Sequence, residues 1–454
     1  MVTQTGSSSI YVGAAKDAQG LSKGFKRTEL GVIPNDWNLP KLGTLIDTSR
    51  SIRYGIVQPG KYYPHGRYMV RGQDYASGWA DPSELFRVSP AVEERYANAR
   101  IKAGDILITI VGASTGRVAI VPQWLSGANL TQTTARIAIN DTKANGSYCG
   151  YVLASWYGRQ QVQNYIKGGA QPGLNCGDIE KFFVPLPPTL SEQEAIAKAL
   201  SNTNALIEAI GKLLDKKRQI KRGAMEELLT GKERLPEFQT TRGNKQSEVG
   251  ILPEDWDSPS LGSILKSVQL GGNYKNTEKE TNWPLIKMGN LGRGNIKLER
   301  LEYIDSSQTP ISRDRLQKDD LLFNTRNTLD LVGKTALWRC ELPEAYFNSN
   351  IMRMEFDRTK VFSKPFMNYL LNSAHCLRRF REIAIGTTSV AAIYTRDLMN
   401  VQLPLPTKPE QEAIGRILSD MDVELTALEQ WLWKVRMISE GLMQALLTGR
   451  IRLL

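Results

Sequence analysis

Cysteine and histidine are scarce in this chain of 454 residues, which has four cysteines and two histidines. The cysteines lie far apart and include no CxxC pair, so they predict neither a disulfide framework nor a zinc site. His65 and His375 fall in different halves of the chain, which excludes an HExxH zinc site or a histidine-based triad within one half. We therefore expect a protein of a reducing compartment that binds no metal.

Long hydrophobic runs are also missing. The most apolar run, ILITIV at 106–111, is far shorter than the roughly 18 residues of a membrane-spanning helix and is typical of a buried strand. The first 25 residues are rich in Gly, Ser and Ala and lack the apolar core of a signal peptide, so they predict a loose tail.

Several catalytic motifs are incomplete or missing. LVGKT at 331–335 resembles the end of a phosphate-binding loop, but Thr328 stands where that loop needs its first Gly. No Pro-Asp dipeptide is present, which removes the PD…(D/E)xK nuclease signature, and no Asn/Asp-Pro-Pro-aromatic sequence is present for holding a flipped base. These absences predict a chain without an active site of its own.

The charge balance points to a polyanionic partner. With 58 Lys and Arg against 47 Asp and Glu, the formal net charge is +11 and the pI is near 9.3. Nucleic acid is the first such partner to consider. The hydrophobic content of 41% and charged content of 23% predict a globular protein of two or three domains.

The chain contains an internal repeat, which predicts two similar halves in tandem. Five pairs of segments match: 29–47 with 248–266, 104–110 with 319–325, 116–121 with 333–338, 185–200 with 404–418, and 227–235 with 445–453. Between these segments the halves diverge. Alternating β-branched and polar residues, Gly/Asn/Pro turns and short helical stretches predict a mixed α+β globule in each half.

Each half ends in a long helical segment, at 192–229 and 410–447. Apolar residues recur there at three-four spacing, which predicts a pair of coiled-coil struts each about 57 Å long. The alternative is a pair of ordinary core helices. The predicted seam residues are Ile196, Leu206, Ile210 and Leu213 in the first helix, and Ile414, Met421, Leu428, Trp431 and Val435 in the second. Gly231 and Gly449 are expected to end the helices in left-handed conformation.

Basic and polar residues gather in the diverged parts of the halves. In the first half the segment 49–75 interleaves arginines with tyrosines, and in the second half 287–295 and 324–328 mix Lys, Arg and Asn. Such residues can neutralise phosphates and contact base edges, although solvated loops are the alternative. The predicted DNA-contact residues are Arg53, Tyr54, Arg71 and Arg117 in the first half, and Lys287, Asn290, Arg293, Arg326 and Asn327 in the second.

Two further basic runs, KKRQIKR at 216–222 and HCLRRFR at 375–381, lie on predicted helices. For the first run a solvated face is the main interpretation, with DNA phosphate or an acidic partner as alternatives. Arg378, Arg379 and Arg381 of the second run are candidates for phosphate contact.

Together these motifs resemble the specificity subunits of type I restriction-modification systems. The resemblance rests on the tandem halves, the EQEAI helix starts, the LLTGK and LLTGR helix ends, and GDILITIVGASTGRVAIV at 104–121, and it covers about 29–454. The segment 168–187 resembles the end of a target recognition domain, whereas AIGTTSVAAIYTRDL at 384–398 departs from that pattern.

The resemblance implies two target recognition domains, each reading one half of an asymmetric, split sequence in double-stranded DNA, with two antiparallel helices as a pseudo-two-fold spacer. The implied bounds are a flexible tail at 1–28, domain 1 at 29–188, helix 1 at 189–232, a linker at 233–247, domain 2 at 248–407 and helix 2 at 408–454.

The resemblance also implies a set of partners and a setting. Two methyltransferase subunits that use S-adenosylmethionine would dock on the helices, restriction subunits that use ATP and Mg²⁺ can join them, and this chain would bind no cofactor. The setting would be phage defence in the cytoplasm of a bacterium or archaeon. Two rival classes remain at this point. One is an enzyme that methylates or cuts DNA unaided, and the other is a coiled-coil adaptor with two protein-binding lobes.

Overall fold

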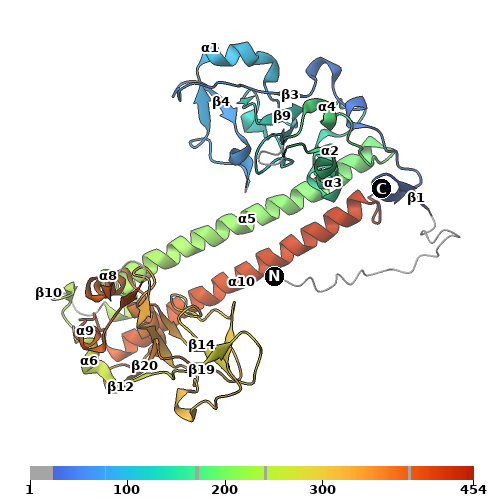
Figure 1. Cartoon of the computed structure of the whole chain (residues 1–454). Helices are drawn as coiled ribbons and strands as arrows, with labels where there is room; N and C mark the ends of the chain where they lie inside the picture. Colours follow the sequence, from blue (N-terminus) through green and yellow to red (C-terminus); the bar gives the residue numbers. More distant parts are fainter. Residues whose placement is uncertain (1–23, 77, 169–172, 240–242, 387–389, 454) are drawn as a thin grey trace. The chain divides into compact units, whose positions relative to one another are not determined.

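The computed structural model of the chain describes residues 24–453 except 77, 169–172, 240–242 and 387–389. The chain forms two compact units, Met1–Ala209 with Leu432–Leu454, and Ile210–Trp431. Two long helices, α5 (Leu190–Leu228) and α10 (Lys408–Leu447), each contribute to both units and are drawn in green and red in Figure 1. The predicted tail lies outside the described residues up to residue 23.

The first unit is built on an antiparallel four-stranded sheet of order β3-β9-β6-β7. Its strands are β3 (Arg53–Tyr54), β9 (Thr134–Ile137), β6 (Ile106–Thr109) and β7 (Val118–Ile120). The apolar run forms β6, all four residues of which are buried. Helix α2 (Gly146–Ala154) packs on β6 and β7, and α3 (Trp156–Tyr165) packs on α2. The predicted buried strand is therefore confirmed.

A smaller sheet of order β5-β4-β8 extends this unit, with β4 and β8 parallel. It consists of β5 (Phe86–Val88), β4 (Arg67–Val70) and β8 (Asn129–Leu130). The remaining elements are the hairpin β1 (Phe25–Thr28) and β2 (Gly31–Pro34) and the short helices α1 (Pro90–Glu93) and α4 (Cys176–Ile179). The sequence places residues 25–28 in a tail, whereas the structure pairs all four with β2.

The second unit repeats this plan. Its four-stranded sheet has the order β12-β20-β16-β18, and its second sheet, β13-β15-β14-β19, again contains one parallel pair, β14 with β19. These strands are β12 (Leu265–Leu270), β20 (Ile351–Phe356), β16 (Leu321–Asn324), β18 (Thr335–Leu337), β13 (Asn276–Thr277), β15 (Glu302–Ile304), β14 (Pro284–Ile286) and β19 (Tyr346–Phe347). Two α+β domains in tandem are thus confirmed.

The second unit contains further elements, some of which match elements of the first unit and some of which do not. They are β10 (Asn244–Ser247), β11 (Gly250–Pro253), β17 (Arg326–Asn327), β21 (Ile385–Gly386), β22 (Ala391–Ala392), α6 (Leu261–Ile264), α7 (Lys364–Leu371), α8 (Ala374–Ile383) and α9 (Thr395–Met399). In the small sheet β17-β22-β21, β21 and β22 come from the segment 384–398 that departs from the family pattern, and β17 lies outside that segment. The sequence places 244–247 in a linker, whereas they form β10 and pair with β11.

In each unit the start of one long helix packs with the end of the other, so the helices run antiparallel. Ile196 of α5 and Leu446 of α10 belong to one apolar core of the first unit, around Trp37. Leu229, just beyond α5, and Ile414 of α10 belong to the corresponding core of the second unit. Gly231 and Gly449 follow the helix ends at φ +71° and +67°, which confirms the predicted caps.

The seam of both helices differs from the predicted one. The less exposed positions follow a regular four-three spacing, namely 196, 200, 203, 207, 210, 214, 217, 221, 224 and 228 in α5, and 414, 418, 421, 425, 428, 432, 435, 439, 442 and 446 in α10. Of the predicted seam residues, Ile196, Ile210, Ile414 and Val435 are buried, and Met421 and Leu428 are half-buried.

Three predicted seam residues are instead exposed: Leu206 by 41%, Leu213 by 39% and Trp431 by 46%. Their neighbours Ile207, Leu214 and Leu432 occupy the seam. An apolar residue stands at both positions of each pair, so three-four and four-three spacing fit the sequence equally well. Neighbouring helix positions lie about 100° apart around the axis, and only the packing partner selects one of them.

An ion cluster ties each helix start to the end of the other helix. In the first unit Arg452 Nη2 donates to Oε2 of Glu192 at 2.8 Å and to Oδ2 of Asp36 at 3.0 Å. In the second unit Arg234 Nη2 donates to Oε2 of Glu410 at 2.7 Å and to Oδ2 of Asp255 at 2.9 Å. The repeat therefore extends to individual side-chain contacts.

Candidate nucleic-acid interface

Matching loops of the two domains carry a cation in the same place. Gly116 ends the loop between β6 and β7, and its N–H donates to the carbonyl oxygen of Thr109 at 2.8 Å. Gly333 ends the loop between β16 and β18, and its N–H donates to the carbonyl oxygen of Asn324 at 2.9 Å. Both glycines have positive φ, and a Cβ would approach within 2.7 Å of Val162 or 2.9 Å of Phe380. Each strained turn then presents the next residue, Arg117 or Lys334.

Three of the predicted residues of the first domain are available to a ligand. Arg53 and Tyr54 form the edge strand β3 and are exposed, Tyr54 by 48%. Arg117 is exposed as well. Within the part of the chain that the structure describes, no ion pair holds Arg53 or Arg117. These side chains can neutralise phosphates or reach base edges.

Arg71 has a structural role instead. Its Nη2 donates to Oδ1 of Asp74 at 2.8 Å, and its backbone N–H donates to Oδ2 of the same carboxylate, which is only 3% exposed. The arginine is therefore held in a turn after β4. This contact does not follow from the sequence, where Arg71 looks like the other arginines of the segment.

The corresponding turn of the second domain holds two more of the predicted residues. Oδ1 of Asn290 accepts the backbone N–H of Lys287 at 2.9 Å, and Nδ2 donates to the carbonyl oxygen of Lys297 at 3.0 Å. Asn290 is only 3% exposed, so the expectation that it contacts DNA was wrong. Lys287 pairs with Glu302 at 2.8 Å. As with Arg71 and Asp74, the polar pair shapes the turn.

Arg326 and Asn327 lie on the short strand β17, which pairs with β22. Arg326 is exposed. Asn327 is half-buried, and its Oδ1 accepts the backbone N–H of Thr328 at 2.8 Å. Of the two, Arg326 is the side chain that can reach a ligand freely.

Arg293 belongs to a basic cluster that the sequence pattern only partly revealed. We define the basic cluster as Arg293, Lys297, Lys334 and Arg381. Partial desolvation lowers the pKa of Arg293, and the nearby Arg381 lowers it further. Burial lowers the pKa of Lys334 below its ordinary value, with Arg293 and Lys297 adding to the effect. Lys297 and Lys334 were not predicted because they are isolated in the sequence.

The basic run on α5 has a different role from this cluster. Lys217 pairs with Glu424 at 2.6 Å and Arg218 with Glu429 at 2.7 Å, both on α10. Lys221 pairs with Asp422 of the same helix. Three cations of the run thus pair with carboxylates of α10, and Arg218 among them stays 52% exposed.

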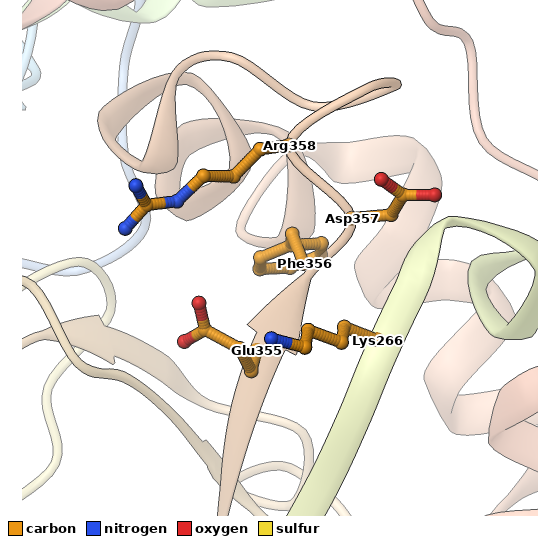
Figure 2. Close-up of a pocket in the computed structure, with 5 residues that line it drawn as sticks. All are labelled: Lys266, Glu355, Phe356, Asp357 and Arg358. Atoms are coloured by element: carbon orange, nitrogen blue, oxygen red, sulfur yellow. The ribbon is translucent and has the colours of Figure 1, made fainter.

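No arrangement typical of an active site emerges from the described residues. A hollow of about 420 Å³ is lined by Lys266, Glu355, Phe356, Asp357 and Arg358 (Figure 2). Glu355 pairs with Lys364 at 3.3 Å, and Oδ1 of Asp357 accepts the N–H of Thr359 at 2.8 Å. Both carboxylates therefore serve local structure. Among the described residues no group of three His, Cys, Asp or Glu is placed to hold a metal ion.

Two α+β domains with different basic surfaces on one repeated scaffold, joined by long helices, define a class of bipartite nucleic-acid reader. The family model of the type I restriction modification DNA specificity domain matches residues 36–218 and 253–432. The chain belongs to this family. It is a specificity subunit with two target recognition domains, and not the catalytic component of its system.

Similar proteins agree with this assignment. The chain is 25% identical over 427 residues to the type I restriction enzyme MjaVIII specificity subunit of Methanocaldococcus jannaschii, covering 92% of this chain and 94% of that protein. The S subunit of the type I restriction-modification system of M. genitalium has a similar fold, with a TM-score of 0.58 and 15% identity. The match covers 90% of this chain and 96% of that chain. A second solved structure, described as the structural basis of complex assembly and conformational transition of the type I R-M system, has a TM-score of 0.51 and 18% identity. The match covers 92% of this chain and 99% of that chain.

Membership of this family argues against both rival interpretations, an enzyme that acts on DNA unaided and a coiled-coil adaptor. Among the described residues, no helix is long and apolar enough to cross a membrane.

Proposed function

We propose that each recognition domain reads one half of a split, asymmetric sequence in double-stranded DNA, and that the long helices set the separation of the halves. The observation that carries this is the repeated scaffold with different side chains at matching surface positions. Arg53 on the edge strand β3 corresponds to Gln269 on the edge strand β12, because each pairs with a matching arginine, Arg136 or Arg353. A common frame with different polar groups suits two different half-sequences.

Sequencing of methylated bases tests this proposal. A host free of DNA methylation would express the methyltransferase alone, with this chain, or with variants in which Arg53 or Arg326 is replaced by Ala. We expect methylation of one split motif only when this chain is present. We expect Arg53→Ala to relax one half of the motif and Arg326→Ala the other. Methylation that does not depend on this chain would overturn the proposal.

The helices carry a matching exposed motif in each unit, which supports two copies of one partner. In the second unit it consists of Lys216, Ile220 and Gly223 on α5, and in the first unit of Lys434, Ile438 and Gly441 on α10. Ile220 is 47% exposed and Ile438 65%. A Cβ built on either glycine would meet nothing within 4 Å.

A glycine inside an exposed helix costs about 1 kcal/mol relative to alanine. Nothing in the described part of this chain requires it at Gly223 or Gly441, whereas a partner helix could approach closely there. Lys216 and Lys434 have no carboxylate partner among the described residues and would suit an acidic side chain. The occupants we propose are two methyltransferase subunits, one on each motif.

Native mass spectrometry of the chain with its methyltransferase tests the number of copies. For the wild type we expect a complex of two methyltransferase subunits with one copy of this chain. For Ile220→Asp or Ile438→Asp alone we expect one methyltransferase subunit with one copy of this chain. The control is Arg358→Gln, an exposed cation of the second domain that belongs to neither motif. A two-to-one complex with the double aspartate variant would refute the docking motifs.

The cofactors follow from this assembly. S-adenosylmethionine would be bound by the methyltransferase subunits, and ATP and Mg²⁺ by restriction subunits when these join, in the cytoplasm of the cell. Dialysis of the isolated chain against labelled S-adenosylmethionine should show no binding, while the complex should bind it.

A further inference from the structure

The basic cluster is assembled by three separate elements of the second domain. Arg293 and Lys297 come from the loop after β14, Lys334 from the residue before β18, and Arg381 from the end of α8. The loop is fixed to the sheet because the N–H of Gly294 donates to the carbonyl oxygen of Thr335 at 2.8 Å. The tertiary structure therefore holds the four cations in one place.

The cluster has little counter-charge. Asp330, itself 86% exposed, lies with Oδ1 3.4 Å from Nη2 of Arg381, and its backbone carbonyl accepts Nη2 of Arg293 at 2.9 Å. No carboxylate in the described part of the chain forms an ion pair with Arg293, Lys297 or Lys334. Burial, and after it the neighbouring cations, lowers the pKa of Lys334. A ligand with several negative charges would relieve the repulsion among the cations.

The described residues of the first domain form no equivalent cluster, although the backbone there matches. Val162 and Phe380 pack at matching glycines, so the next residues on these helices, Gln163 and Arg381, occupy matching places. The N–H of Ala80 donates to the carbonyl oxygen of Asp74 at 2.8 Å. In the same way the backbone N–H of Lys297 donates to the carbonyl oxygen of Asn290 at 2.7 Å.

Lys297 thus corresponds to Ala80, and the segment 75–79 that matches the surroundings of Arg293 contains no Lys or Arg. Arg117, in the place of Lys334, is the cation that remains. One domain therefore presents four cations at a surface where the other presents one.

We propose that the basic cluster is a phosphate clamp, and that the second domain supplies most of the backbone affinity of the protein. This rests on the proposed function, in which both domains bind one duplex. Lys334 is half-buried, and Arg293, Lys297 and Arg381 are exposed, so the four cations are accessible to the phosphates of a duplex backbone. The first domain then depends more on direct contacts of polar and aromatic groups such as Tyr54 with base edges.

Salt dependence of DNA binding tests the clamp. The complete complex with methyltransferase would be titrated onto a duplex carrying its motif, and the slope of log affinity against log salt measured. Each phosphate contact contributes about 0.9 to that slope. For Lys297→Gln/Lys334→Gln/Arg381→Gln we expect the slope to fall by about 2 to 3, so the loss of affinity between about 50 and 200 mM salt becomes ~16- to 64-fold smaller.

Two controls separate a clamp from a change in net charge. Lys266→Gln/Arg358→Gln removes two cations of the same domain at the hollow shown in Figure 2, and we expect an unchanged slope. Arg117→Gln removes the one matching cation of the first domain, and we expect a fall of about 1 at most. The methylated motif should stay the same in every variant, because phosphate contacts carry no sequence information.

Three results would overturn the clamp: an unchanged slope in the triple variant, an equal fall in the Lys266/Arg358 control, or a changed motif in the triple variant. A failure of the proposed function is distinguishable, since the wild-type complex would then bind motif and random duplexes equally.

Discussion

Arg234 and Glu410 form a buried ion pair in which Nη2 lies 2.7 Å from Oε2, and the side chain of Glu410 has no exposed surface. Arg234 follows one long helix and Glu410 lies in the first turn of the other. Arg452 and Glu192 repeat this relationship in the first unit. The pair thus joins the start of one long helix to the chain just beyond the end of the other.

Removal of Arg234 should destabilise the second unit strongly. In Arg234→Ala the carboxylate of Glu410 stays buried without its cation, for which about 3 to 5 kcal/mol is expected. Urea unfolding followed by circular dichroism would measure the loss. Lys232→Ala, a neighbouring exposed cation, is the control and should change stability little. A loss below about 1 kcal/mol for Arg234→Ala would contradict the importance of the pair.

The two matching tryptophans should respond differently to replacement by phenylalanine. Nε1 of Trp256 donates to Oε2 of Glu410 at 2.9 Å, whereas Nε1 of Trp37 is buried without a partner in the structure. Trp256→Phe should therefore cost about 1 to 3 kcal/mol more than Trp37→Phe, because a buried carboxylate loses a donor. Thermal unfolding of both variants checks this, and equal losses would disagree with the geometry.

Neighbouring leucines on α5 distinguish the seam from the exposed face. Leu214 is 3% exposed and Leu213 is 39% exposed. Leu214→Asp places a charge in the seam and should cost several kcal/mol of unfolding free energy, on the order of 3 or more. Leu213→Asp should change it by about 0.5 kcal/mol or less. Equal losses of unfolding free energy in the two variants would contradict the four-three seam and support the three-four seam expected from the sequence.

DNA binding should weaken at alkaline pH through Lys334. Burial and neighbouring cations lower its pKa in the free protein, and a phosphate would raise it again. Binding therefore gains from the protonated lysine below the lowered pKa, and the gain is lost as the pH rises through that pKa toward the higher value of the complex. Titrations over the alkaline range in which the duplex stays intact would show this.

Lys334→Arg is the matched control for that titration, because arginine keeps its charge and stands at the matching position 117 of the first domain. We expect its affinity to vary less with pH than that of the wild type. The same pH dependence in both proteins would assign the effect to another group.

The two docking motifs should bind the methyltransferase unequally. Beside Ile438, α10 exposes Trp433 by 63% and Met437 by 50%, whereas the matching positions of α5 hold Asp215 and Gln219. Additional buried apolar area strengthens association, so the first methyltransferase copy should occupy α10. Calorimetric titration of Trp433→Asp/Met437→Gln should show a selective loss of the tighter binding step. Loss of the weaker binding step instead would show that the first methyltransferase copy binds the motif on α5.

The sequence alone revealed the features that depend on local pattern or on self-similarity. The repeat predicted two α+β domains, because segments that match over long stretches fold alike. The run at 106–111 predicted a buried strand, since β-branched residues suit a pleated, buried surface. The helix ends at Gly231 and Gly449 were predictable, because few other residues adopt positive φ without strain.

Tertiary contacts decided the rest. Leu213 and Leu214 are equally apolar, and only the opposing helix places one of them in the seam. Arg71, Asn290 and Arg117 all look like surface polar residues in the sequence. In the structure a carboxylate holds Arg71 and a turn holds Asn290, whereas no ion pair among the described residues holds Arg117. Lys297 and Lys334 are far apart in the sequence and become one basic cluster because a loop bonds to the edge of a sheet. Side-chain chemistry was readable from the sequence, whereas which groups lie together or stay exposed depends on long-range packing.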